Sequence, residues 1–318
     1  MTNARIYAPR ILPDSDPQHL VIRASSFVIS HFPTMSHHIA VIGPGLLGAS
    51  IALAARRAEG VRVAIWARRP AIVEEVRARE IADFVSTDIA DVVAEADVVV
   101  MCVPVGAMPA LAREILPHLR PRALVTDVGS VKANVVAELS AILRGRGRFI
   151  GSHPMAGSDK AGHAAAAAGL FDGRVCIVTP DATTAPDALT DVTAFWQSLG
   201  CRVRTLAPAE HDEVVALVSH LPHLLAATLV NTVAERNVGA LDFHGPGFFD
   251  TTRVASGQPD LWVEILRANS AAVRAGAEAM IEKLREITTL LEREEPMKEF
   301  LTHAKTLRDQ LRPANHDV

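Results

Sequence analysis

The chain is poor in cysteine and in aromatic residues. Its three cysteines, Cys102, Cys176 and Cys201, are far apart and lie in apolar runs without CxxC spacing. We therefore expect buried free thiols, with neither a disulfide framework nor a metal site. Free thiols suit a reducing compartment, and a cytoplasmic location is expected. Because only 4% of the 318 residues are aromatic, alanine, valine and leucine must fill the core.

The chain also lacks a strong charge of either sign and a long uninterrupted apolar run. A net charge of −4 argues against the large basic surface that nucleic-acid binding needs. No apolar run reaches the roughly 18 residues of a membrane helix, so no membrane association is expected. Residues 1–34 carry scattered prolines without the order of a signal peptide. We expect them to form a disordered extension, with a start at Met35 as the alternative.

What the sequence does contain is a regular alternation of short apolar runs and helical stretches. Strands are expected over residues 38–43, 61–67, 96–104, 122–129 and 147–154, and helices over 46–57, 71–79, 107–118 and 133–143. Continuous valine and isoleucine runs between helices are typical of a parallel sheet that is covered on both faces. The sequence thus predicts a doubly wound α/β domain, to which residues 174–180 and 201–206 add strands.

After about residue 207 the strand pattern stops. A long helix with a kink at Pro222 is expected, and helical periodicity returns over residues 259–292. We expect residues 35–206 to form a Rossmann nucleotide-binding domain, 207–294 a helical substrate and dimerisation domain, and 295–318 a charged tail. The helical half has more apolar surface than one small bundle can bury, which favours a homodimer built on these helices.

A glycine-rich turn follows the first expected strand. In IAVIGPGLLGAS the glycines have GxGxxG spacing and lead into a helix. This context permits close approach of the backbone to a pyrophosphate, which the helix N-terminus attracts. A purely structural tight turn is the alternative. The cofactor-binding residues expected here are Gly43, Gly45, Leu46, Leu47 and Gly48, with Val103 and Pro104 from the end of the strand over 96–104.

The end of the second strand bears on the choice of cofactor. NAD-binding proteins usually have an acidic residue there for the ribose hydroxyls, whereas this strand ends in Ala67, Arg68 and Arg69. The two guanidinium groups are suited to a 2′-phosphate, which favours NADP over NAD. Solvent-facing arginines on a loop are the alternative.

Two polar loops follow later strands, at the sheet edge where open α/β sheets bind ligands. In DVGSVK, Ser130 is expected to cap the following helix, and Lys132 is either a solvated charge or part of the site. In GSHPMAGSDKAG, Pro154 restricts His153 to an extended conformation near the expected nicotinamide. Imidazole is a natural base near neutral pH, so His153 is a candidate catalytic residue. A loop histidine that bonds a neighbouring carbonyl is the alternative.

Five motifs occur together in one order along the chain: GPGLLGAS, DVGSVK, GSHPMAGSDKAG, HDEVVALVSHLPHLLA and FFDTTRVA. Because of these motifs and their order, the sequence resembles the prephenate/arogenate dehydrogenase family of tyrosine biosynthesis over residues 37–290. The resemblance implies an oxidative decarboxylation, in which a hydride leaves C4 of a cyclohexadienol for NAD(P) and the ring carboxylate departs as CO2. Prephenate would yield 4-hydroxyphenylpyruvate, and the motifs do not separate prephenate from arogenate as the small-molecule substrate.

The resemblance also implies roles for single residues. His153 corresponds to the base that deprotonates the C4 hydroxyl, and Ser130 to the serine that orients this histidine and the substrate. Arg253 corresponds to an arginine that binds a substrate carboxylate, and His220 to a histidine that lines the pocket.

Four further residues are weighed in the same way. Asp159 stands where many relatives have a longer glutamate that helps to gate the site, and its neighbour Ser158 is expected to contact substrate. His223 is given a structural role in core packing, and Asp212 is a plausible supporting acid whose default role is structural.

Two other classes of protein are considered. A β-hydroxyacid dehydrogenase has the same two-part layout but uses a lysine of its helical domain, and residues 207–282 contain no lysine. A non-catalytic NADP-binding sensor would keep the glycine-rich turn but would need neither His153 nor Arg253. The presence of both favours the dehydrogenase of tyrosine biosynthesis.

Overall fold

The computed structural model of the protein describes residues 37–157 and 162–311. These residues belong to one compact unit, which spans Thr34–Val318. The predicted N-terminal extension and two site candidates, Ser158 and Asp159, lie outside the described residues. The domain bounds given above stay a prediction.

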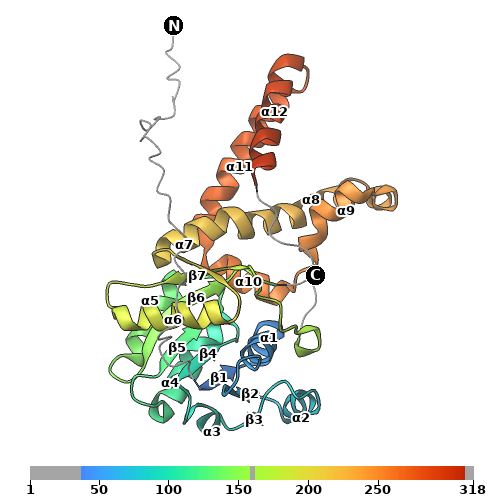
Figure 1. The fold of residues 1–318 in the computed structure, drawn as a ribbon. Coiled ribbons are helices and arrows are strands. Elements are labelled where there is room, and N and C mark those ends of the chain that lie inside the picture. The colour runs from blue at the N-terminus through green and yellow to red at the C-terminus, as the bar shows by residue number, and fades with distance from the viewer. Residues whose placement is uncertain (1–36, 158–161, 312–318) are drawn as a thin grey trace, which may run out of the picture. The chain divides into compact units, whose positions relative to one another are not determined.

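An eight-stranded sheet occupies the first part of the described chain (Figure 1). Its strand order is β3-β2-β1-β4-β5-β6-β7-β8. The strands are β1 His38–Ile42, β2 Arg62–Trp66, β3 Phe84–Ser86, β4 Val98–Met101, β5 Leu124–Asp127, β6 Arg148–Pro154, β7 Val175–Thr179 and β8 Arg202–Thr205. Every neighbouring pair is parallel except β6 and β7. The predicted mostly parallel sheet is confirmed, but β3 is missed because three residues are too few to show a period.

Helices cover both faces of this sheet, because its strands are apolar on both sides. In β1, Ile39 and Val41 pack in one apolar cluster with α1, α2 and α6, whereas Ala40 and Ile42 pack in another with α3, α4 and α5. The helices are α1 Leu46–Ala55, α2 Pro70–Ala78, α3 Ile89–Val93, α4 Met108–Ile115, α5 Ala133–Leu143 and α6 Pro186–Ser198. The alternating side chains of a doubly buried strand thus produce the three layers.

From Pro208 onward the described chain is helical (Figure 1). Pro222 lacks an N–H group and occupies the first turn of α8, directly after a π-helical turn that adjusts the hydrogen bonding. The elements are α7 Pro208–Val215, the π-turn η4 Ala216–His220, α8 Leu221–Asn237, η5 Val238–Phe243, α9 Pro246–Thr252, η6 Arg253–Ser256, α10 Pro259–Ala268, α11 Ser270–Leu290 and α12 Glu294–Gln310. The first of them, α7, contacts α5 and β7 of the sheet domain.

The helical segment Pro208–Phe243 is long and apolar enough to cross a membrane by length and composition alone, with a mean hydropathy of 1.6 over an 18-residue window. The expectation that no segment is long and apolar enough for a membrane helix is therefore wrong by length and composition. Uncharged serine, histidine, threonine and asparagine interrupt the apolar run without lowering its mean hydropathy enough. Only 33% of the window is buried, and Leu217, Val218 and Leu229 are exposed on this segment. A single chain therefore leaves apolar surface uncovered here.

Candidate active site

The glycine-rich turn between β1 and α1 is shaped for close contact with a ligand. Gly43 has a φ of +105°, and a Cβ there would lie 2.6 Å from the Cys102 carbonyl oxygen. A Cβ on Gly48 would lie 2.1 Å from the Gly43 carbonyl oxygen, so neither position accepts a larger residue. A Cβ on Gly45, in contrast, would have no neighbour within 4 Å. The turn is therefore open beside the N-terminus of α1.

The N-terminus of α1 fits the pyrophosphate of a dinucleotide. No side chain caps it, and its first turn contains no acidic residue. The N–H groups of Leu46 and Leu47 can bond phosphate oxygens, which the helix dipole also favours. The end of β4 reaches the same turn, since Val103 Cγ1 would lie 2.9 Å from a Cβ on Gly43, and the exposed Pro104 follows it. The structure thus brings together the cofactor-binding residues predicted after β1 and β4.

The two arginines predicted to select the cofactor lie just beyond β2. Both Arg68 and Arg69 are exposed, and Arg69 directly precedes α2. The N–H of Gly43 donates to the Trp66 carbonyl oxygen at 3.0 Å, which ties the glycine-rich turn to the end of β2. The side chains of Arg68 and Arg69 therefore extend from backbone that lies next to the turn that fits the pyrophosphate.

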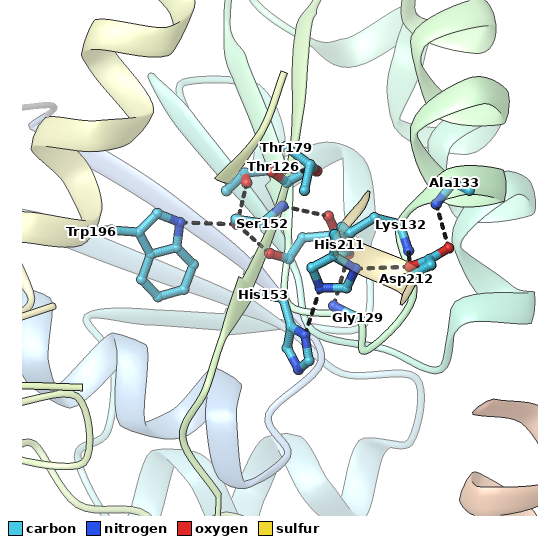
Figure 2. Close-up of polar contacts among 12 residues, drawn as sticks. Thr126, Gly129, Lys132, Ala133, Ser152, His153, Thr179, Trp196, His211 and Asp212 are labelled. Atoms are coloured by element: carbon cyan, nitrogen blue, oxygen red, sulfur yellow. Dashed lines mark hydrogen bonds and ion pairs between the residues drawn. The ribbon is translucent and has the colours of Figure 1, made fainter. Parts of the chain in front are cut away.

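His153 lies in β6 and is only 8% exposed. Its Nδ1 lies 2.9 Å from Nε2 of His211, and the Nδ1 of His211 lies 2.8 Å from Oδ1 of Asp212 (Figure 2). His211 and Asp212 belong to α7, and His211 is fully buried. A helix of the second half of the chain thus supplies the partner of the strand histidine. We call these three residues the His–His–Asp row.

Asp212 also holds the start of α5. Its Oδ1 accepts the N–H of Lys132 at 2.7 Å, and its Oδ2 accepts the N–H of Ala133 at 2.9 Å. The prediction that Ser130 caps this helix is wrong, because α5 begins at Ala133 and the carboxylate that caps it comes from α7. Ser130 lies in the loop before α5, and its backbone faces the imidazole of His220. The partner of His153 Nδ1 is therefore His211 rather than Ser130.

Lys132 forms an ion pair with Asp127 in the interior, where both side chains have 0% exposure. Oδ2 of Asp127 also accepts the N–H of Gly129 at 2.8 Å, and Oδ1 accepts that of Ser152 at 3.1 Å (Figure 2). A Cβ on Gly151 would lie 3.2 Å from Lys132 Cδ, so glycine leaves room for the lysine stem. Of the two interpretations of Lys132, the solvated charge is therefore wrong.

Burial and neighbouring charges set the protonation of the His–His–Asp row. Burial lowers the pKa of His153 well below its ordinary 6.5, and the neighbouring His211, Lys132 and His220 lower it further. Burial by itself would raise the pKa of Asp212, but hydrogen bonds from His211 and from the N–H groups at the start of α5 outweigh it and lower this pKa. At neutral pH, His153 is thus an uncharged base and Asp212 a carboxylate.

His220 lies at the end of the π-turn η4 and is fully buried. Its Nδ1 lies 3.3 Å from the amide nitrogen of Asn269, which also donates to the Asp212 carbonyl oxygen at 2.7 Å. Its Nε2 is buried and has no hydrogen-bond partner among the described residues. Burial lowers the pKa of His220 to about 4, although Asp212 opposes this shift. An unpartnered buried polar atom is costly, and a substrate group that bonds it would remove that cost.

Two further candidates that the structure describes are Arg253 and His223. Arg253 begins η6 and is exposed. His223 stacks on Trp262 with ring centroids 3.5 Å apart, in keeping with the structural role given to it. A Cβ on Gly257 would lie 2.3 Å from the indole nitrogen of Trp262, so a glycine is required beside this stack. The structure therefore brings His220 to the row, whereas no hydrogen bond or ion pair among the described residues joins Arg253 to it.

Sequence reasoning misses three members of the site: His211, Asp127 and Asn269. His211 stands in the polar run Glu210–Glu213 of α7, which resembles the solvated start of a helix, so no local signal marks it. Asp127 falls within the strand expected over residues 122–129, but nothing in the local sequence indicates its partner, and nothing there distinguishes Asn269 from an exposed residue. Within residues 37–157 and 162–311, no group of three or more histidine, cysteine, aspartate or glutamate side chains could hold a metal ion.

These features define a dinucleotide-binding α/β protein with a buried, uncharged histidine at the carboxyl edge of its sheet. Residues 51–205 match the model of the prephenate dehydrogenase nucleotide-binding domain, and residues 207–306 that of the prephenate dehydrogenase dimerization domain. The chain belongs to the prephenate dehydrogenase family, which confirms the resemblance drawn from the motifs.

Individual relatives agree with this assignment. The chain is 35% identical to a cyclohexadienyl dehydrogenase of Zymomonas mobilis subsp. mobilis, covering 81% of this chain and 89% of the relative. It is 34% identical to a prephenate dehydrogenase of Bacillus subtilis, covering 87% and 76%. The crystal structure of prephenate dehydrogenase from Aquifex aeolicus, in complex with hydroxyphenyl propionate and NAD+, aligns with a TM-score of 0.80 and 31% identity and covers 86% of this chain and 97% of that one.

Proposed function

We propose that this protein oxidises and decarboxylates prephenate or arogenate, with hydride transfer to a nicotinamide cofactor. The observation that carries the proposal is an uncharged, buried histidine, His153, at the sheet edge that also holds the glycine-rich turn. The family and the names of its relatives support the same reaction. The aromatic phenol that results makes the reaction strongly favourable.

The residues of the chain act on the substrate as follows. A nicotinamide held at the glycine-rich turn would supply the acceptor for the hydride that leaves C4. His153 takes the proton of the C4 hydroxyl as that carbon is oxidised, which its lowered pKa permits because it is unprotonated at neutral pH. When CO2 leaves, the electrons of the broken C–C bond enter the ring, and the phenolate oxygen takes the proton back from His153. Arg253 would bind a substrate carboxylate and His220 a polar group of the substrate.

We also propose that NADP is preferred over NAD. The support is the pair of exposed residues Arg68 and Arg69 at the end of β2, where no acidic residue stands to bind the ribose hydroxyls. KM measured for both cofactors tests this preference. A lower KM for NADP in the unmodified protein, lost in the Arg68→Ala variant, is expected. A clear preference for NAD would overturn it.

The helical half is proposed to pair two copies of the chain. The support is the uncovered apolar surface of Pro208–Phe243 together with the match to a dimerization domain. Burying apolar surface between two chains would offset its exposure in one. Light scattering on the purified protein should give the mass of a dimer, and Leu217→Glu should shift the protein toward the monomer. A monomeric parent protein would contradict this arrangement.

A cytoplasmic location, without binding to membrane or nucleic acid, stays a prediction.

The activity is tested by incubating the purified protein with each substrate and each oxidised cofactor while following the absorbance of reduced nicotinamide. Oxidation of prephenate or arogenate, lost in His153→Asn, is the expected result. Oxidation of a 3-hydroxy acid instead would favour the β-hydroxyacid dehydrogenase alternative. Cofactor binding without turnover of any of these compounds would favour the non-catalytic sensor.

A further inference from the structure

The His–His–Asp row raises a question that the base role of His153 leaves open. A neutral imidazole carries one N–H and one lone pair, and only the nitrogen with the lone pair can take a proton. Nδ1 of His153 is engaged by His211, so the base must be Nε2. That nitrogen has a lone pair only if the proton of the ring sits on Nδ1.

The carboxylate of Asp212 determines which ring nitrogen of His211 carries a proton. A carboxylate only accepts hydrogen bonds, and Asp212 already accepts two backbone N–H groups at the start of α5. The Nδ1 of His211, 2.8 Å from the same carboxylate, must therefore be the donor and carry a proton. The remaining question is whether Nε2 of His211 also carries one.

A neutral His211 fits its surroundings better than a cationic one. Its side chain is fully buried, and a charge in the interior is costly unless it has a counter-charge of its own. The ammonium group of Lys132 is buried nearby with Asp127, and the charge of Asp212 is already met by the N-terminus of α5. Among the described residues, His220 also faces the row, and its lowered pKa leaves it neutral. In neutral His211, Nε2 carries the lone pair and accepts the Nδ1–H of His153.

We propose that His211 and Asp212 are positioning residues that hold His153 in its Nδ1–H tautomer, with the Nε2 lone pair directed to the proton it removes. The structural role given to Asp212 from the sequence is thus only part of its function. When Nε2 of His153 takes a proton, the ring becomes positively charged. The existing hydrogen bond from its Nδ1–H to Nε2 of His211 stabilises that charge. The identity of the proton donor, the C4 hydroxyl, rests on the proposed function, whereas the tautomer of His153 is independent of that function.

The tautomer can be measured directly on the whole protein without substrate. Nitrogen-15 NMR of histidine-labelled protein at pH 8 separates protonated from bare ring nitrogens, and loss of one signal pair in His153→Asn assigns the residue. We expect His153 to carry its proton on Nδ1 and to have a bare Nε2. A protonated Nε2 on His153 in the unmodified protein would overturn the proposal, whatever the enzyme acts on.

Two variants of His211 then separate positioning from packing. His211→Phe fills the site but removes the acceptor, so His153 should become a mixture of tautomers and kcat should fall about 10- to 100-fold with little change in KM. His211→Gln can place an amide oxygen near the lost Nε2, and it should restore the Nδ1–H tautomer and part of kcat. His223→Phe, a buried histidine outside the row, should leave the His153 spectrum unchanged.

The outcomes distinguish this proposal from the proposed reaction. An unchanged tautomer and kcat in His211→Phe would show that His211 does not position His153. If His211→Phe does not fold, the spectra of the unmodified protein and of His211→Gln decide the matter alone. If neither prephenate nor arogenate is oxidised while His153 shows the Nδ1–H tautomer, the proposed reaction fails and the positioning role stands.

Discussion

Replacing Lys132 by methionine should destabilise the protein by about 3–5 kcal/mol, because the change leaves the carboxylate of Asp127 buried without its cation. Both side chains have 0% exposure, so water cannot take the place of the ammonium group. The two N–H groups that Asp127 also accepts, from Gly129 and Ser152, compensate only part of the lost charge. Methionine keeps most of the stem volume, so packing beside Gly151 changes little.

Urea denaturation measures this loss as a lower transition midpoint at an unchanged slope. A double-mutant cycle with Asp127→Asn isolates the interaction between the two side chains, which we expect to exceed about 2 kcal/mol. The exposed pair of Lys283 and Glu286 is the matched control, and its coupling should be below about 1 kcal/mol. A Lys132→Met variant within about 1 kcal/mol of the parent would refute the argument that a desolvated carboxylate depends on this lysine.

Other variants test separate parts of the site. His153→Asn should lower kcat by about 10²–10⁴ with KM little changed, and a near-normal kcat would remove it as the base. Arg253→Ala should raise the substrate KM about 10-fold or more, whereas an unchanged KM would exclude Arg253 from carboxylate binding. Because burial lowers the pKa of His220 to about 4, its unfolded form binds a proton first as the pH falls below 6.5. The free energy of unfolding should therefore fall by about 2 kcal/mol between pH 6.5 and 4, and His220→Gln should show a smaller fall in urea titrations at each pH.

Much of the fold follows from local sequence. Strands that are buried on both faces have no polar alternation, so β1 and β4 appear as nearly continuous apolar runs, HIAVI and VVVM. The GxGxxG spacing depends on steric limits at Gly43 and Gly48, which no other residue satisfies. Such signals are contained within a few consecutive residues, and they can therefore be recognised from the sequence alone.

The polar site is less readable, because its hydrogen bonds join residues that are far apart in the chain. Asp212 caps a helix whose first residue is 79 positions earlier, and no local pattern connects it with Ala133. Lys132 follows a strand, where a lysine is usually solvated, and only the room left by Gly151 lets it turn inward. His153 could be predicted because strand end, proline and base chemistry coincide within one loop. His211 could not, because its role depends on where α7 docks.

The helical segment Pro208–Phe243 has a consequence for which of its residues can vary. With a rise of about 1.5 Å per residue, its 36 residues extend over roughly 54 Å. One end supplies His211 and Asp212 to the sheet domain, while exposed leucines and valines follow along its length. Mutational tolerance is usually judged from exposure in one chain. If two chains pair through this segment as proposed, that measure misleads here, because a charge placed at Leu217 or Val218 would then face another apolar surface rather than water.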